Sequence, residues 1–286
     1  MPKIPTKKTV RNRAWEIDAL RGIAILLVVF DHLMYDCAVL FGEAWYASGN
    51  QALIALSDFA YDFLTSDLKI YGWIVFVFLF FFLSGIATAF SRNNLNRGLR
   101  LAAVALALSA VTYGISCIPG FEGTFIRFGV LHCIALNILI YALLRLIVDR
   151  LPFAARRIAL VLVPLTVAGA AIGVHLVLNV PILEVAKNSF AIQTDNPALG
   201  ILVYCENWYS ADYFPLLPYA VPFFAGATVA PLVYPRRKSL LPALDRAWHR
   251  PLSFAGRHSL WFYLGGQVVG IGIFALITLA VTGSPF

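Results

Sequence analysis

Long apolar stretches alternate with short polar segments along the chain. They cover roughly residues 18–41, 70–91, 98–118, 127–148, 157–180, 213–234 and 255–281. A helix needs about 20 apolar residues to cross the hydrocarbon core of a bilayer, and each stretch reaches that length. The pattern therefore predicts an all-α fold, a polytopic membrane helix bundle of about seven transmembrane helices.

The first apolar stretch carries ionisable residues along one side. At about 100° per residue, Asp18, Arg21, His32 and Asp36 share a helical face, whereas Asp31 lies about 140° away from Asp36. At 1.5 Å per residue, Asp18 and Asp36 are about 27 Å apart, close to the hydrocarbon thickness. Because a charge at bilayer depth costs about 2.5 kcal/mol or more, this face should line a protein interior or a wet cavity. We therefore expect a functional site there.

Composition supports a membrane protein. Hydrophobic residues make up 60% of the 286 residues and charged residues 13%, whereas soluble domains carry about 25% charged residues. The chain is therefore predicted to be an integral membrane protein, and the lipid bilayer is its first expected partner.

The basic residues predict the orientation. Of the 22 lysines and arginines, 19 fall in the segments 1–21, 92–100, 145–157 and 236–257. Cytoplasmic loops are rich in Lys and Arg, so these segments and the N-terminus are predicted to be cytoplasmic and the C-terminus outside. This distribution explains the net charge of +7 without a nucleic-acid partner.

The same topology divides the chain. Residues 1–17 form a cytoplasmic basic N-terminus, and residues 18–286 form a single transmembrane domain with long outer loops at 42–69 and 181–212. Apolar residues recur at helical spacing over 53–64, which predicts a short amphipathic helix on the outer side.

Four cysteines lie in the outer half of this topology, at positions 37, 117, 133 and 205. They show no C-x-x-C spacing and no paired histidines, so neither a metal nor a redox motif is expected. A disulfide stays open, because four cysteines allow three pairings.

Prolines and glycines mark the last two stretches. The sixth contains Pro215, Pro218, Pro222 and Pro231, so that helix should be kinked or start late. In the seventh, the spacing of Gly266 and Gly270 predicts close packing against another helix.

His32 is the candidate for acid–base chemistry. A neutral imidazole can take a proton from a hydroxyl or an amine near pH 7. Asp36, one turn further, could hold the ring in one tautomer. The alternative is a His–Asp pair that only ties two helices together.

Charged residues also gather at the predicted cytoplasmic end. Guanidinium groups bind phosphate bidentately, so this group suits a phosphate-bearing ligand. The alternative is the ordinary excess of arginine in cytoplasmic loops. The residues are Arg13, Asp18 and Arg21 of the first stretch and Arg92, Arg97 and Arg100 in the link between the second and third.

Aromatic residues and carboxylates meet at the end of the second long outer loop, where Trp208 is followed by Asp212 and Tyr213. Stacking rings beside carboxylates are typical of carbohydrate binding. An ordinary interfacial aromatic belt would look the same.

Several blocks, in order over most of residues 11–270, resemble a known family. Arg13-Ala-Trp-Glu-Ile-Asp18-Ala-Leu-Arg21, with His32 fourteen residues after Asp18, resembles the N-terminal helix of the transmembrane acyltransferase superfamily, and Phe81-Phe82-Leu83-Ser84-Gly85 resembles its second helix. Three further blocks resemble bacterial relatives of the heparan-alpha-glucosaminide N-acetyltransferase catalytic domain. These are Arg127-Phe-Gly-Val-Leu-His132, Asp212-Tyr-Phe-Pro-Leu-Leu-Pro218 and Pro251-Leu-Ser-Phe-Ala-Gly-Arg257-His258-Ser259-Leu260.

The resemblance implies transfer of an acyl group, most often acetyl, from cytoplasmic acyl-CoA to a hydroxyl or amine of an extracytoplasmic sugar or glycan. It implies acyl-CoA as donor, no metal, and the bacterial inner membrane as location. His32 would be the catalytic histidine, either as direct general base, which we favour, or as acyl carrier. Asp18, Arg21, Ser84 and the nearby arginines would shape the acyl-CoA entry.

The acceptor end is assigned to side chains nearer the outer side. The candidates are Arg127, His132, Asn137, Trp208, Asp212, Tyr213 and Gln267, although His132 and Asn137 could equally serve helix packing. Gln267 follows a glycine where many relatives have histidine, so the acceptor chemistry of this chain can differ from theirs.

Two other functions fit the same ionisable face. A proton-coupled transporter or flippase would use it as a proton relay. A non-catalytic membrane module would tolerate loss of His32. The sequence leaves the acyl chain length, the acceptor and the oligomeric state open, with a homodimer as one alternative.

Overall fold

The computed structural model describes residues 14–285 except 178–195, 206 and 209. These residues form helices and connecting loops without a β-strand, as the sequence predicts. The α-helices are α1 (Trp15–Tyr35), α2 (Gly42–Ser48), α3 (Gln51–Thr65), α4 (Asp67–Ile86), α5 (Asn94–Ser116), α6 (Val130–Val148), α7 (Phe153–Val177), α8 (Pro197–Leu202), α9 (Leu216–Val233), α10 (Arg250–Arg257) and α11 (Ser259–Thr282).

Seven helices in the described part are long and apolar enough to cross a membrane. They are α1 with the π-helical turn Asp36–Leu40 that continues it, α4 with the 3₁₀ turn Ala87–Phe90, and α5, α6, α7, α9 and α11. The predicted number of spans is thereby confirmed.

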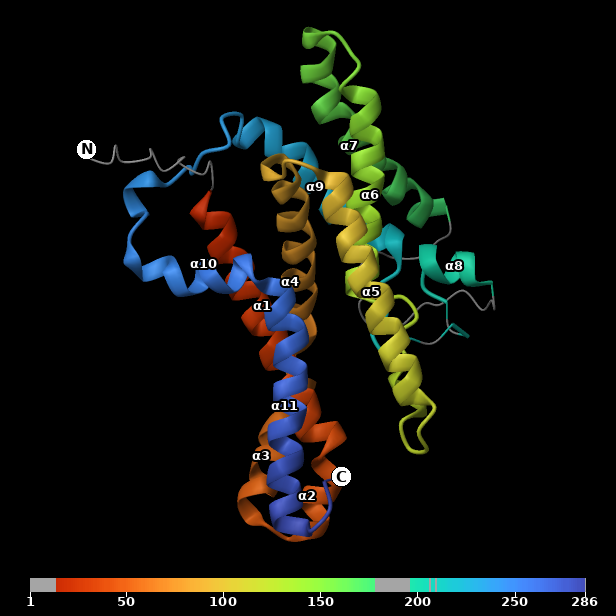
Figure 1. Cartoon of the computed structure of the whole chain (residues 1–286), viewed down its shortest axis with the longest axis vertical. Helices are drawn as coiled ribbons and strands as arrows, with labels where there is room; N and C mark the ends of the chain where they lie inside the picture. Colours follow the sequence, from red (N-terminus) through yellow and green to blue (C-terminus); the bar gives the residue numbers. More distant parts are fainter. Residues whose placement is uncertain (1–13, 178–195, 206, 209, 286) are drawn as a thin grey trace, which may run out of the picture.

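The spans pack around α9, which is the most buried of them. α9 lies between α4 and α7 and also touches α6, while α5 pairs with α6. α1 packs against α10 and α11. Figure 1 shows α5, α6 and α7 on one side of the molecule and α1 and α11 on the other, diverging toward the end that carries α2 and α3.

Two pairs of glycines let helix backbones touch. A Cβ at Gly85 of α4 would lie 1.9 Å from the carbonyl oxygen of Phe223, and one at Gly226 of α9 would lie 2.0 Å from that of Phe82. Gly22 of α1 and Gly256 of α10 form a second reciprocal pair, with 1.9 Å to the Leu252 oxygen and 1.8 Å to the Asp18 oxygen. In a bilayer such close approach supplies the van der Waals contact that holds helices together.

The predicted late start of the sixth span and the predicted close packing of the seventh are both present. α9 starts at Leu216, directly after Pro215, and contains Pro222 and Pro231 within it. On α11, Cβ atoms at Gly266 and Gly270 would lie 2.9 Å from Val29 and 2.3 Å from Leu33 of α1. The small residues therefore do bring α11 onto α1.

The first of the two loops predicted to be outer, residues 42–69, folds largely into helices. α3 starts after Asn50, whose side chain accepts hydrogen bonds from the amides of Ala52 and Leu53 at 3.1 and 3.3 Å. The predicted amphipathic helix is thus confirmed and is slightly longer than expected. Trp45 of α2 is fully buried and donates to the Thr278 hydroxyl at 2.7 Å, which joins this loop to α11.

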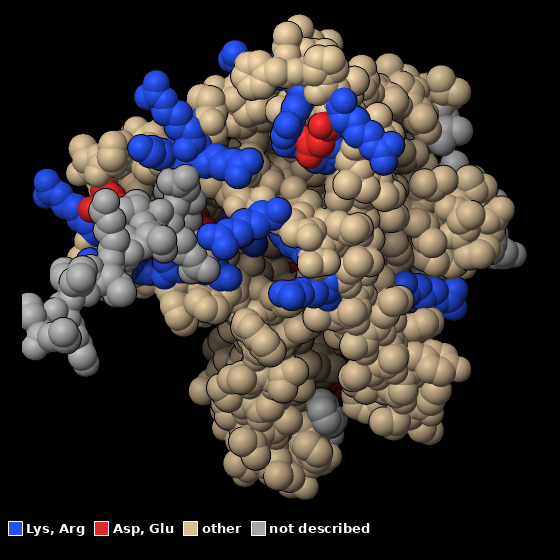
Figure 2. All heavy atoms as spheres, turned by 45° about the horizontal axis from the view of Figure 1, so that its top comes forward, with Lys and Arg blue, Asp and Glu red and all other residues tan. Residues whose placement is uncertain are grey.

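The basic side chains that the structure describes lie mostly at one end of the bundle. Figure 2, with the top of Figure 1 turned forward, shows Lys and Arg side chains gathered there. One boundary differs from the prediction: α5 starts at Asn94, because the Asn93 side chain caps it by accepting from the Asn96 amide at 2.9 Å. Arg97 and Arg100 are therefore helical residues of α5 and not part of a link.

All four cysteines are free thiols. Cys37, Cys133 and Cys205 are buried, and Cys117 is exposed. The disulfide that the sequence left open is therefore not formed.

Candidate functional site

A cavity of about 550 Å³ lies between α1, α4, α5, α6 and the start of α11. Most of its wall is apolar or aromatic, and its polar residues fall into two groups. It is lined by Arg21, Ile25, Val28, His32, Trp73, Val77, Phe80, Phe81, Ser84, Asn93, Asn96, Arg97, Arg100, Leu101, Val104, Val130, Leu131, Ile134, Asp212, Phe214, Ser259, Leu260 and Tyr263. Four of the residues predicted to form the donor site, together with His32, thus reach one cavity.

The first polar group lies at the start of α5. Asn93, Asn96 and Arg100 are exposed, so the cavity is open to its surroundings here, while Arg97 is half-buried. From α1, Arg21 also lines the cavity, and its Nη2 donates to the Ser259 hydroxyl at 3.0 Å. Amides and guanidinium groups therefore surround this mouth.

Arg97 and Arg21 place like charges close together. The positive charges of the Arg97 and Arg21 guanidiniums are close enough to interact electrostatically. In the part of the chain that the structure describes, no carboxylate forms an ion pair with Arg97. Three guanidinium groups line this mouth, and guanidinium binds phosphate and carboxylate groups through two hydrogen bonds, so the arrangement suits an anionic ligand.

His32 lies deeper in the cavity. It is eleven residues beyond Arg21 on α1, about 16 Å along the helix axis at 1.5 Å per residue. Its ring meets the Tyr263 ring edge-on, with centroids 5.6 Å apart. Within the described residues, the buried Nδ1 of His32 has no hydrogen-bond partner. The imidazole therefore lines the cavity, and no hydrogen bond at Nδ1 fixes its tautomer.

Asp36 forms hydrogen bonds with Gln267 of α11. Both of its carboxylate oxygens accept from the Gln267 side chain at 3.0 Å. Helix α1 passes into a π-helical turn at Asp36, and Gly270 of α11 lies beside this carboxylate. The structure therefore ties Asp36 to α11 and does not bring it into a hydrogen bond with His32.

The second polar group pairs Asp212 with Tyr263. Oδ2 of Asp212 accepts from the Val130 amide at 2.9 Å and from the Tyr263 hydroxyl at 3.2 Å. The carboxylate fits here because residue 129 is glycine: a Cβ there would lie 2.2 Å from Oδ2. Burial raises the pKa of Asp212 to about 6. Asp212 and Tyr263 thus line the same cavity as His32, and Tyr263 contacts both the Asp212 carboxylate and the His32 ring.

This carboxyl predicts a pH-dependent stability. An unfolded aspartate titrates near pH 3.9, so between about pH 4 and 6 the folded protein binds more protons than the unfolded chain. Stability should therefore fall as the pH rises through this window. We expect the melting temperature in detergent to be higher at pH 5 than at pH 7, and we expect Asp212→Asn to reduce this difference. Equal pH dependence in the two proteins would contradict the assignment.

A comparison of the sequence with protein-family models identifies the family of this chain. The model for the catalytic domain of heparan-alpha-glucosaminide N-acetyltransferase matches residues 13–268, which include every residue that lines the cavity. The chain belongs to this family. No curated protein and no solved structure matches it. As a member of the heparan-alpha-glucosaminide N-acetyltransferase family whose described residues include seven helices long and apolar enough to cross a membrane, it is a transmembrane acetyltransferase.

Of the remaining residues predicted to bind the donor in this heparan-alpha-glucosaminide N-acetyltransferase domain, one lines the cavity and others lie outside its wall. Ser84 is buried on α4 and lines the cavity. Asp18 is half-buried on α1 and packs against Gly256 through its backbone, outside the cavity wall. Arg92 is exposed next to the mouth, and Arg13 lies outside the described residues.

Of the acceptor candidates, only Asp212 lines the cavity. His132 accepts from the Gly129 amide at 3.2 Å and lies 3.1 Å from the Ser109 hydroxyl, so it caps α6 and joins it to α5. Asn137 is fully buried and donates to the Cys133 carbonyl at 2.9 Å. Both therefore have helix-packing contacts, the alternative that the sequence left open.

The other candidates also have contacts outside the cavity wall. The Tyr213 hydroxyl donates to the backbone oxygens of Gly200 and Val203 at 2.7 and 2.9 Å. Trp208 is buried against Gly200. Arg127 is exposed and lies over the Phe125 ring at 5.6 Å, and Gln267 holds Asp36. Their role toward an acceptor stays a prediction.

Sequence reasoning missed several residues of the heparan-alpha-glucosaminide N-acetyltransferase cavity. Ser259 and Tyr263 are four residues apart on α11, so they share a helical face, and this spacing was a usable signal. Asn93 and Asn96 stand at the start of α5 next to the arginines. No group of His, Cys, Asp and Glu able to hold a metal ion occurs in the described residues.

Proposed function

We propose that this protein transfers an acyl group, most simply acetyl, from acyl-CoA to a hydroxyl or amine of a sugar or glycan on the other side of the membrane. One observation carries the proposal: a single cavity joins a mouth lined by Arg21, Arg97 and Arg100 to His32 and the Asp212–Tyr263 pair. The gathering of basic residues at this end supports a cytoplasmic mouth, with the N-terminus on the same side. Sequence reasoning further suggests a bacterial inner membrane.

The donor enters at the basic mouth in this proposal. The phosphates of CoA bind the guanidiniums of Arg21, Arg97 and Arg100, since a guanidinium group binds phosphate through two charge-assisted hydrogen bonds. The pantetheine arm follows the apolar wall inward. The distance from Arg21 to His32, about 16 Å along α1, matches the need for a long arm between phosphate and thioester.

The transfer itself uses His32 as general base. The acceptor oxygen or nitrogen attacks the thioester carbonyl carbon while His32 takes its proton, and a C–O or C–N bond forms. The C–S bond then breaks, and the imidazolium returns the proton to the leaving thiolate, giving free CoA. Asp212 and Tyr263 orient the acceptor, because the carboxylate accepts from a hydroxyl or amine and the phenol can donate.

The proposal is tested by mass spectrometry of products. Purified protein in detergent or nanodiscs receives acetyl-CoA and a panel of mono- and oligosaccharides with free hydroxyls or amines. Acetylated sugar and equimolar CoA are expected. Acyl-CoA that neither binds nor turns over in a folded sample would overturn the proposal, and sugar or ion movement driven by a proton gradient would instead support a transporter.

Arg97→Gln is expected to weaken donor binding. The substitution keeps a hydrogen-bonding side chain but removes the charge that faces the mouth, and a charge-assisted hydrogen bond contributes about 1.5–3 kcal/mol. We therefore expect the Kd for CoA to rise about 10- to 100-fold, measured by titration calorimetry. Arg92→Gln is the matched control, since Arg92 is exposed and outside the cavity wall. Equal effects of the two substitutions would show that only the general positive charge matters.

A further inference from the structure

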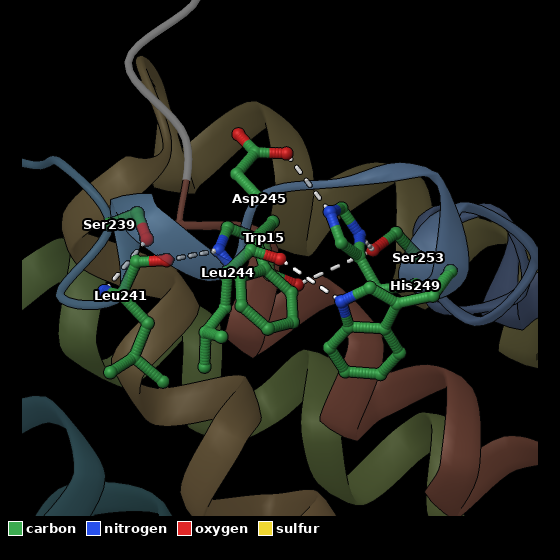
Figure 3. A network of polar contacts seen from close by, with 8 residues as sticks. Trp15, Ser239, Leu241, Leu244, Asp245, His249 and Ser253 are labelled. Carbon is green, nitrogen blue, oxygen red and sulfur yellow. Dashed lines mark hydrogen bonds and ion pairs between the residues drawn. The ribbon is translucent and has the colours of Figure 1, made fainter.

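A partly buried hydrogen-bond network ties α10 to the start of α1, six residues before Arg21. Nε2 of His249 lies 2.9 Å from Oδ1 of Asp245, and its Nδ1 lies 2.9 Å from the Ser253 hydroxyl. Ser253 in turn donates to the backbone oxygen of Trp15 at 3.4 Å. Figure 3 shows these side chains converging around Trp15. The pattern of residues along the chain did not predict this network.

Aromatic stacking strengthens the same junction. The rings of Trp15 and His249 are stacked, with centroids 4.2 Å apart and planes at 26°. The Trp15 indole donates to the Leu241 carbonyl at 3.1 Å, so the loop before α10 is joined as well. His249 and Ser253 are 5% and 2% exposed. With so little access, the Ser–His–Asp order serves the structure and does not present a nucleophile to a substrate.

The other end of α10 leads to the cavity. Beyond this junction the helix runs along α1 through the backbone contact of Gly22 and Gly256. α11 begins at Ser259, directly after α10, and its hydroxyl accepts from Arg21. α10 is therefore attached to α1 at both ends, at Trp15 by the network and at Arg21 by Ser259.

We propose that Asp245, His249 and Ser253 are positioning residues for the donor site, because they fix α10 against α1 and so hold the Arg21–Ser259 pair at the mouth of the cavity. None of the three lines the cavity, so they act through Arg21. The inference rests on the proposed function in that the ligand of Arg21 is taken to be acyl-CoA. Loosening the network should then affect the binding of the donor more than the transfer step.

The test compares Asp245→Ala with Asp245→Asn. Asp245 is 61% exposed at its side chain, so neither substitution leaves a cavity in the core. Alanine removes the acceptor for the His249 ring, whereas asparagine keeps an oxygen there. We expect Asp245→Ala to raise KM for acetyl-CoA about three- to tenfold, the effect of losing one hydrogen bond, with kcat nearly unchanged. Asp245→Asn should restore KM to near the wild-type value.

Two further measurements separate the explanations. Asp149→Ala is the matched control, because Asp149 is also a half-exposed carboxylate with ion pairs, to Arg145 and Arg156, but lies away from the network. Hydrogen exchange of α10 amides reports the network without any ligand and should be faster in Asp245→Ala.

An unchanged KM, or a rise shared equally by Asp149→Ala, would overturn the positioning role, as would unchanged exchange. If wild-type protein neither binds nor turns over acyl-CoA, the proposed function is wrong and the donor role falls with it. Exchange that still rises in Asp245→Ala would then leave only a structural junction.

Discussion

Replacing His32 by alanine should abolish acyl transfer while leaving the binding of acyl-CoA intact. His32 lines the cavity about 16 Å beyond Arg21 along α1, and its ring makes no hydrogen bond that holds another part of the described structure. Loss of a general base costs about 10²- to 10⁴-fold in rate. We expect kcat to fall by at least that range, with little change in the Kd for CoA, measured by product formation and by calorimetry.

His258→Ala is the matched control for this experiment. His258 is also a histidine, between α10 and α11, but it is exposed and outside the cavity wall. The transfer rate of this variant should stay within about twofold of wild type, as surface substitutions rarely have large effects. A His32→Ala variant with undiminished transfer would remove His32 from the mechanism and favour the non-catalytic alternative.

Adding a single methyl group between α4 and α9 should disrupt the bundle. In Gly226→Ala the new Cβ would lie 2.0 Å from the carbonyl oxygen of Phe82, well inside van der Waals contact, and neither backbone can move without separating the two helices. Overpacking of this kind costs about 1–3 kcal/mol and more where backbone must shift. We expect a markedly lower melting temperature and reduced activity, because α4 also carries Ser84 to the cavity.

A glycine-to-alanine substitution on α7 should not lower the melting temperature. Gly169 lies on α7, and no heavy atom lies within 4 Å of the point that its Cβ would occupy, so alanine fits there. Alanine is favoured over glycine in a helix by about 1 kcal/mol. Gly169→Ala should therefore leave the melting temperature unchanged or raise it. Equal destabilisation by both substitutions would show that backbone contact at Gly226 does not determine the packing.

The positions of the spans could be predicted from the sequence, because the bilayer imposes a simple rule on them. Each span must be long and apolar, so the seven spans could be located from hydropathy alone. Local chemistry also predicted the late start of α9 after Pro215 and close helix packing at Gly266 and Gly270, although not that α1 would be the partner. The reciprocal contact between Gly85 and Gly226 could not be predicted, because it depends on which helices become neighbours.

The candidate site was predictable only in part for the same reason. Helical periodicity placed Arg21 and His32 on one face of α1, and both reach the cavity. Periodicity cannot say which neighbour a side chain will meet, so Asp36 was expected beside His32 although Gln267 of α11 engages it. Tyr263 was missed because its contact with Asp212 joins residues 51 positions apart.

The largely apolar wall of the cavity bears on a side reaction that such an enzyme must suppress. A thioester reacts with water as well as with alcohols and amines, so a wet channel would waste donor by futile hydrolysis. Apolar residues of the wall, such as Val77, Phe81 and Ile134, offer water no hydrogen bonds. In the proposed reaction, a bound acyl-CoA would thus stay protected from water until the acceptor reaches the cavity.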